Sequence, residues 1–223
     1  MKNGVELRLS RLFNRDENVV IVAADHGEFD GPIEGMENLP AVLGRISPDV
    51  DGVLLSPGML LRCRHVFDYK GAPLAVVRLN WSTVYCSGWD YGEGHTAQVI
   101  SGRDAIAAGA DIALVSLSLQ SDSEKTDAGN VELYARLAQD AHDAGLPVIG
   151  EVFPPRGEGL TGEELYDKIL RGCRIIAELG ADMIKTFYTP RFRTVVKQSA
   201  VPWLMPSLMM SCSSLVRGTR HIS

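Results

Sequence analysis

The chain has 223 residues, of which 45% are hydrophobic and 22% charged, a composition that can bury the core of one large domain. Its net charge of −6 gives no support for binding to nucleic acid or to an anionic membrane. No apolar run approaches the roughly 20 residues that span a bilayer, and the charged N-terminus is unlike a signal peptide. Four separated cysteines without a CxxC pair favour reduced thiols. We therefore expect a cytoplasmic protein with one domain over 1–223.

The charges are distributed unevenly. All 28 acidic residues lie within 1–182, whereas six of the 22 basic residues lie in 183–223. This distribution has two interpretations: a basic surface or irregular tail, or an anion site near the C-terminal part of the domain.

Short apolar segments recur along the chain and predict strands. Helical segments separate the later ones, and each helix ends at a glycine, as at Gly145 and Gly180, which suits a left-handed helix end. Strands that are apolar on both faces and alternate with helices indicate a parallel sheet. The predicted strands are 18–25, 51–56, 73–80, 111–117, 147–153 and 181–187, with a seventh at 200–205.

This regular spacing favours an α/β TIM (β/α)₈ barrel over a doubly wound sheet. The first strand is followed by the polar loop "DHGEFDG" (25–31) and not by the GxGxxG of a dinucleotide-binding fold. Barrel active sites lie in such loops, at the carboxyl ends of the strands. The pattern stops near residue 205, and a closed barrel typically needs ~250 residues. We therefore expect a barrel that is incomplete after strand 7, with an irregular or non-native tail at 206–223.

Three predicted strands carry ionisable groups near their carboxyl ends: Asp25, Glu151 and Lys185. A lysine among apolar groups is more readily deprotonated, and its neutral amine can form a Schiff base with a carbonyl. Carboxylates close by could move the protons. Each residue also has an ordinary interpretation, namely a snorkelling lysine, a turn-forming aspartate and a glutamate in a salt bridge.

Other polar and aromatic residues leave further alternatives open. A metal-dependent lyase or hydrolase would use His26 and nearby carboxylates, but no HxH or HExxH spacing is present, and we predict no metal. Arg156 and Arg191 follow strands 5 and 6, where they could bind a phosphate or carboxylate or simply be solvated. Aromatic residues after strand 3 could line a pocket, although packing explains them equally: Trp81, Tyr85, Trp89 and Tyr91.

Five segments together resemble the class I, Schiff-base aldolases of the DeoC/LacD superfamily, especially archaeal-type fructose-bisphosphate aldolases and their dideoxy-heptulosonate synthase relatives. They occur in the family's order and cover roughly residues 10–205. The segments are "VVIVAADHGEFDGPIEG" (19–35), "DGVLLSPGML" (51–60), "GADIALVSLSLQSDSE" (109–124), "LPVIGEVFPPRG" (146–157) and "GADMIKTFYT" (180–189).

The resemblance implies a lyase that makes or breaks a C–C bond of a ketose or keto-acid phosphate without a cofactor. It implies that Lys185 forms the Schiff base and that Asp25 assists proton transfer. Glu151 matches a glutamate of tagatose-bisphosphate aldolase-like relatives, and Arg156 matches the arginine of the family's "PRG" turn. His26, in the "DHG" segment, and Arg191 are the other predicted substrate-binding residues.

Two departures from the family pattern are visible. The tyrosine of "YPRG", a general acid in archaeal members, is absent, since Pro154 precedes "PRG" here. The glycine-rich phosphate loops after strands 7 and 8 are replaced by "VPWLMPSLMMS" (201–211). An inactive, aldolase-like binding protein is therefore an alternative. An unclosed sheet also exposes edges that can pair with another chain, so we expect a homo-oligomer.

Overall fold

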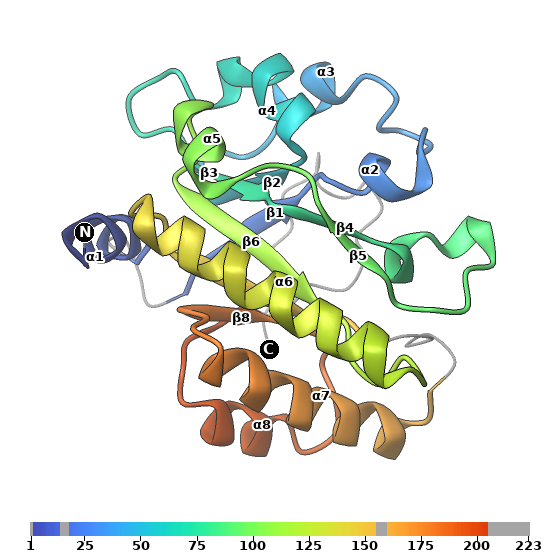
Figure 1. The fold of residues 1–223 in the computed structure, drawn as a ribbon. Coiled ribbons are helices and arrows are strands. Elements are labelled where there is room, and N and C mark those ends of the chain that lie inside the picture. Colours follow the sequence, from blue (N-terminus) through green and yellow to red (C-terminus); the bar gives the residue numbers. More distant parts are fainter. Residues whose placement is uncertain (1, 14–17, 155–159, 205–223) are drawn as a thin grey trace.

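The computed structural model describes residues 2–13, 18–154 and 160–204. The predicted site residue Arg156 and the predicted tail at 206–223 lie outside the described residues. The main sheet has seven parallel strands (Figure 1). They are β1 (Ile21–Ala23), β2 (Gly52–Leu55), β3 (Leu74–Arg78), β6 (Ile112–Leu117), β7 (Val148–Val152), β8 (Met183–Lys185) and β9 (Trp203–Leu204).

The strand order of this sheet is β1-β2-β3-β6-β7-β8-β9. Each crossover moves in the same direction, as in a barrel, whereas a doubly wound sheet reverses direction at a switch point. In the described residues β1 and β9 do not pair, so the sheet is open. The predicted α/β barrel, incomplete after strand 7, is confirmed, and each predicted strand contains an observed one with shorter bounds.

Helices cover the outer face of this sheet (Figure 1). The helix α6 packs on β6, α7 packs on β7 and β8, and α8 packs beside α7. A capping box formed by Thr161 and Glu164 fixes the start of α7. The helices are α1 (Lys2–Leu12), α2 (Gly27–Asp30), α3 (Leu39–Leu43), α4 (Pro57–Arg62), α5 (Gly102–Ala107), α6 (Glu124–Asp143), α7 (Gly162–Glu178) and α8 (Phe192–Ser199).

The inner face of the sheet has two layers. Because strand side chains alternate between faces, every second residue of a strand lies on this inner face. The lower layer, nearer the amino ends of the strands, is a buried apolar cluster. On β3, β6, β7 and β8 the side chain two residues after the last apolar member of this layer is polar, and these four side chains form the upper layer. The lower layer contains Leu54, Leu74, Val76, Ile112, Leu114, Ile149 and Met183, and the upper layer contains Arg78, Ser116, Glu151 and Lys185.

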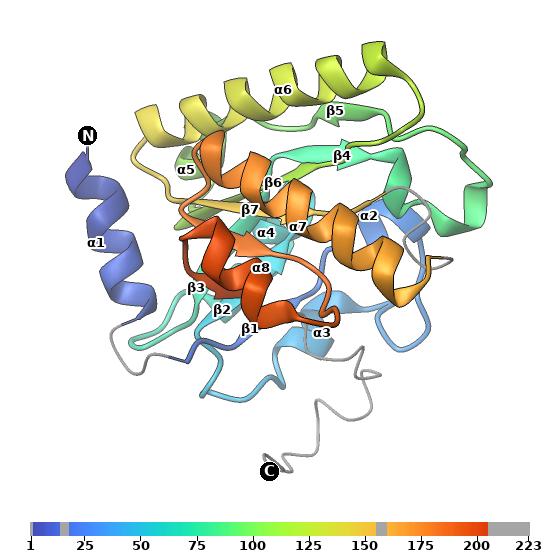
Figure 2. The same cartoon turned by 90° about the horizontal axis from the view of Figure 1, so that it is seen from below.

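The helix α1 was not predicted, and it closes the lower layer from below. Leu12 is buried in the same cluster as the lower layer. Arg11 contacts Asp111 and Arg8 contacts the Gly145 carbonyl, both of which precede inner strands. Figure 2 shows α1 at one side of the sheet, separate from the helices that cover the outer face.

An antiparallel hairpin after β3 was also not predicted. Its strands are β4 (Asn80–Ser82) and β5 (Thr96–Gln98), joined through the short helices η2 (Thr83–Tyr85) and η3 (Ser87–Trp89). A third such helix, η1 (Arg64–Val66), follows α4. The Asn80 side chain makes three hydrogen bonds to Ser116, which fixes the hairpin to the carboxyl end of β6.

Candidate active site

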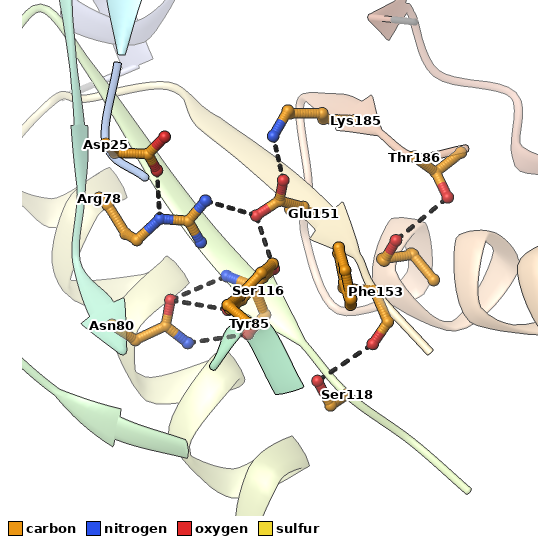
Figure 3. A network of polar contacts seen from close by, with 11 residues as sticks. Asp25, Arg78, Asn80, Tyr85, Ser116, Ser118, Glu151, Phe153, Lys185 and Thr186 are labelled. Atoms are coloured by element: carbon orange, nitrogen blue, oxygen red, sulfur yellow. Dashed lines mark hydrogen bonds and ion pairs between the residues drawn. The ribbon is translucent and has the colours of Figure 1, made fainter. Parts of the chain in front are cut away.

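Four charged side chains form a cluster at the carboxyl ends of the strands (Figure 3). Asp25 follows β1, Arg78 ends β3, Glu151 lies near the end of β7 and Lys185 ends β8. The side chains of Asp25, Arg78 and Glu151 are at most 4% exposed, whereas that of Lys185 is 22% exposed. Lys185 is thus the member of this cluster that solvent or a ligand reaches most easily.

The Arg78 guanidinium joins the two carboxylates. Its Nε donates to Asp25 Oδ2 at 2.6 Å, and its Nη2 donates to Glu151 Oε2 at 2.7 Å. Lys185 Nζ donates to the other oxygen, Oε1, of Glu151. Glu151 and Lys185 are also direct partners in the register of β7 and β8. The structure therefore brings together the three predicted catalytic residues Asp25, Glu151 and Lys185, with Arg78 between them.

The environment of Glu151 keeps it ionised. Burial by itself would raise the pKa of this carboxyl, but the Arg78 and Lys185 cations outweigh burial and lower the pKa to about 2. Arg78 stays charged as well: burial opposes its charge, but Glu151 and Asp25 raise its pKa well above the usual value. At neutral pH Glu151 is therefore a carboxylate, which accepts hydrogen bonds from its neighbours.

Tyr85, from η2, completes the contacts of Glu151. Its hydroxyl donates to Glu151 Oε2 at 2.6 Å, and its ring lies 4.6 Å from the Phe29 ring and 4.4 Å from the Phe153 ring, centroid to centroid. Burial and the Glu151 charge raise the pKa of Tyr85 well above its usual value. The phenol is therefore protonated over the whole neutral range.

The loop after β1 brings two more titratable groups to this end of the sheet. His26 directly precedes α2 and makes no side-chain capping hydrogen bond. Its Nδ1 is buried without a hydrogen-bond partner among the described residues, and the same holds for Glu28 Oε2. Burial raises the pKa of Glu28 to about 7, with Arg78 opposing and Asp25 adding to the shift. His26 stays a predicted substrate-binding residue, and Glu28 is a further titratable group beside the cluster.

Arg191 does not join this cluster. Its guanidinium pairs with Glu163 and lies over the Tyr166 ring, at 3.9 Å from the ring centroid, so it contacts the start of α7. Its substrate-binding role, like that of Arg156, stays a prediction.

Within residues 2–13, 18–154 and 160–204, no three His, Cys, Asp or Glu side chains are grouped so as to hold a metal ion. The metal-dependent alternative thus gains no support there. Among the described helices, none is both long enough and apolar enough to cross a membrane.

Arg78 and Tyr85 were not predicted as site residues. Arg78 has a visible signal, since "PLAVVRLN" (73–80) ends an otherwise apolar strand with a charge. Tyr85 has a weaker one: it was one of four aromatic residues in the same loop, and nothing in the spacing separates it from the others.

The parallel sheet, with its strands in sequence order, has counterparts among solved structures. An archaeal fructose-1,6-bisphosphate aldolase, whose catalytic lysine is covalently bound to the carbinolamine intermediate of the substrate, superposes with a TM-score of 0.72. The two chains are 28% identical, and the match covers 92% of this chain and 81% of the other. A Schiff-base-forming fructose-1,6-bisphosphate aldolase gives 0.71 at 27% identity, over 94% and 85% of the two chains. The fold is that of the TIM-barrel aldolases.

A family model described as DeoC/LacD family aldolase matches residues 19–212. An uncharacterized aldolase of Saccharolobus solfataricus is 29% identical over 207 residues, covering 91% of this chain and 76% of its own. A 2-amino-3,7-dideoxy-D-threo-hept-6-ulosonate synthase of Halobacterium salinarum is 30% identical over 203 residues, covering 89% and 72%. The chain belongs to the DeoC/LacD family of aldolases.

Proposed function

We propose that the protein is a class I aldolase in which Lys185 forms a Schiff base with a ketose or keto-acid phosphate. The observation that carries this proposal is the contact of Lys185 Nζ with the buried carboxylate of Glu151 at the carboxyl ends of β7 and β8. The named relatives act on, or are named for, substrates of these two kinds.

The chemistry follows from the charges. Lys185 adds to the carbonyl as the neutral amine, after its ammonium has lost a proton, and the ionised Glu151, with its pKa near 2, is the counter-ion of the iminium that forms. Addition of this amine to a carbonyl and loss of water give an iminium cation. The cation withdraws electrons from the neighbouring carbon, which allows a C–C bond to break or form without a metal or organic cofactor. Asp25, which pairs with Arg78, is the carboxylate to which we assign proton transfer with the substrate.

Borohydride trapping tests this function. The protein is incubated separately with dihydroxyacetone phosphate, dihydroxyacetone and pyruvate, reduced with borohydride, digested and analysed by mass spectrometry. We expect a stable adduct on Lys185 with at least one probe, because borohydride converts an iminium to a secondary amine. Lys185→Met should lose the adduct and lower turnover at least about 10³-fold.

Lys197→Met is the matched control, because Lys197 is an exposed lysine on α8, and it should behave as the wild type. Folded wild-type protein that stays unlabelled with all three probes would contradict the proposal. That result would favour the alternative of an inactive, aldolase-like binding protein.

We also assign the activity to the cytoplasm, in line with four separated cysteines and no CxxC pair, and expect a homo-oligomer. The open sheet within the described residues offers β1 and β9 as edges for pairing with another chain. Light scattering should give a mass above 24.3 kDa; a monodisperse monomer would contradict the expected association.

A further inference from the structure

The carboxylates of the charged cluster are ionised, whereas Schiff-base formation also needs a proton donor. When a carbinolamine loses its oxygen as water, that oxygen must receive a proton. Three side chains contact the Glu151 carboxylate in the described part of the chain: Arg78, Lys185 and Tyr85. Arg78 is held as a cation, Lys185 is the nucleophile, and Glu151 itself is ionised. Tyr85 is the neutral donor of this set.

Tyr85 and Lys185 contact different oxygens of the same carboxylate, that of Glu151. The Tyr85 hydroxyl faces Oε2 at 2.6 Å, whereas Lys185 Nζ faces Oε1 (Figure 3). The two groups are therefore separated by one carboxylate. Because Nζ itself contacts Glu151, a substrate carbon bonded to Nζ would lie near this carboxylate, toward which the phenol also points.

The position of the phenol is fixed from several sides. Its ring packs between Phe29 and Phe153, and Asn80, at the start of the same hairpin, is hydrogen-bonded to Ser116. Trp81 Nε1 donates to the Glu28 carbonyl at 3.2 Å, which ties the hairpin to the loop after β1. Such packing holds a donor in one geometry, as proton transfer requires.

We propose that Tyr85, acting within the proposed Schiff-base function on which this inference rests, is the catalytic proton donor to the departing oxygen of the carbinolamine. The C–O bond breaks, its electron pair leaves with the oxygen, and the oxygen takes the phenolic proton and departs as water. The nitrogen lone pair forms the C=N bond. The resulting phenolate then takes a proton from the substrate hydroxyl whose ionisation breaks the C–C bond, which restores the phenol.

A cation beside Tyr85 offsets part of the cost that burial and the Glu151 charge place on a transient phenolate. The Arg78 guanidinium carbon lies 4.8 Å from the centroid of the Tyr85 ring, so a cation is already in place beside the charge that develops. Arg78 Nη1 is buried and has no hydrogen-bond partner among the described residues, which leaves both N–H groups of this nitrogen uncommitted.

The test compares rates of iminium formation in Tyr85→Phe and in the wild type. This substitution removes the hydroxyl and keeps the ring between its aromatic neighbours. Borohydride trapping on Lys185 is followed over time with whichever of dihydroxyacetone phosphate, dihydroxyacetone or pyruvate labels the wild type. We expect labelling and kcat to fall about 10²–10³-fold with little change in KM, because the substrate still binds and adds to the amine.

Tyr134→Phe is the matched control. Tyr134 is a fully buried tyrosine of α6 whose hydroxyl lacks a hydrogen-bond partner among the described residues, and its variant should label like the wild type. Equal labelling rates for Tyr85→Phe and the wild type would overturn the proposed role of Tyr85 but not the Schiff-base function. Absence of labelling in the wild type would overturn the Schiff-base function and this inference with it.

A second variant covers the case in which Tyr85→Phe does not fold. Incorporation of 3,5-difluorotyrosine at position 85 keeps the hydrogen bond to Glu151 and makes the phenol more acidic. The pH above which labelling slows, because the phenol has lost its proton, should then be lower than in the wild type. A purely structural role of the hydroxyl would not produce this change. An unchanged pH limit in this folded variant would overturn the proposal.

Discussion

The two layers on the inner face of the sheet lie only two residues apart along a strand, yet one is apolar and the other is polar and charged. The lower layer, with Leu114 and Ile149, is apolar and is closed by α1. The upper layer holds Arg78, Glu151 and Lys185, which pair with one another and with Asp25. The lower layer is stabilised by exclusion of water, whereas the upper layer persists because its charges compensate each other.

This difference shows how one sheet can provide both stability and reactivity. The cluster of Asp25, Arg78, Glu151 and Lys185 has equal numbers of positive and negative charges. A single buried charge would be costly, but each member here has a partner of opposite sign. Removal of one member should therefore do more damage than the loss of an equivalent surface charge.

Arg78→Met should have the largest effect. It leaves the buried carboxylates Asp25 and Glu151 close together without their shared cation, and we expect a loss of about 4 kcal/mol in the free energy of unfolding. Arg174→Met is the control, because Arg174 pairs with Glu178 on the surface of α7, and it should cost less than about 1 kcal/mol. Urea denaturation measures both, and equal losses would contradict the role of burial.

Leu114→Ala should come next and should separate the layers. Leu114 is 1% exposed within the lower layer, so its truncation should cost about 3 kcal/mol while kcat per folded molecule is retained. Leu61→Ala, on the exposed side of α4, should be nearly neutral. A large loss of kcat in folded Leu114→Ala protein would show that the layers are not independent.

The pH dependence of stability should report Glu151. Because its pKa is lowered from 4.5 to about 2 in the folded protein, its contribution is present above pH 4.5 and is lost as pH falls toward 2. Between pH 6 and pH 3 this contribution should decline by about 2 kcal/mol. Urea denaturation gives the free energy of unfolding of the wild type and of Glu151→Gln at both pH values. The wild type should lose about 2 kcal/mol more than the variant between pH 6 and pH 3. Parallel losses would contradict the lowered pKa.

Glu28 should show a smaller effect of opposite sign. Its pKa is raised to about 7, so its contribution is present below pH 4.5 and is lost as pH rises through 7. Glu28→Gln should thus become more stable than the wild type between pH 5 and pH 8, by no more than about 1 kcal/mol because solvent screens this partly exposed group. A stability difference that does not change with pH would contradict this assignment.

The sequence was sufficient to predict the parallel sheet and the neighbouring positions of Glu151 and Lys185. Both follow from the two-residue period of a strand and from the meeting of carboxyl ends at one edge of a parallel sheet. The glycines that follow α6 and α7 correctly indicated where these helices end. Gly145 and Gly180 have φ values of +82° and +99°, which other residues adopt only with strain.

The remaining features depend on contacts between distant segments. Arg78 pairs with Asp25, 53 positions away, and with Glu151, 73 positions away, and no local pattern specifies such partners. The side chain of Tyr85 reaches Glu151 only because the β4–β5 hairpin folds over the carboxyl edge. The helix α1 was missed for a related reason, since its polar sequence says little about which end of the sheet it covers.

The placement of Tyr85 also bears on how such an enzyme could change during evolution or by design. The phenol is carried by a hairpin that is attached to β6 through the Asn80–Ser116 hydrogen bonds, whereas Lys185 and Glu151 belong to the sheet itself. Exchange of residues 80–98 could therefore alter the proposed acid of the site and leave the strands of the main sheet untouched. Hairpin libraries on a constant barrel would offer a practical route to new carbonyl substrates.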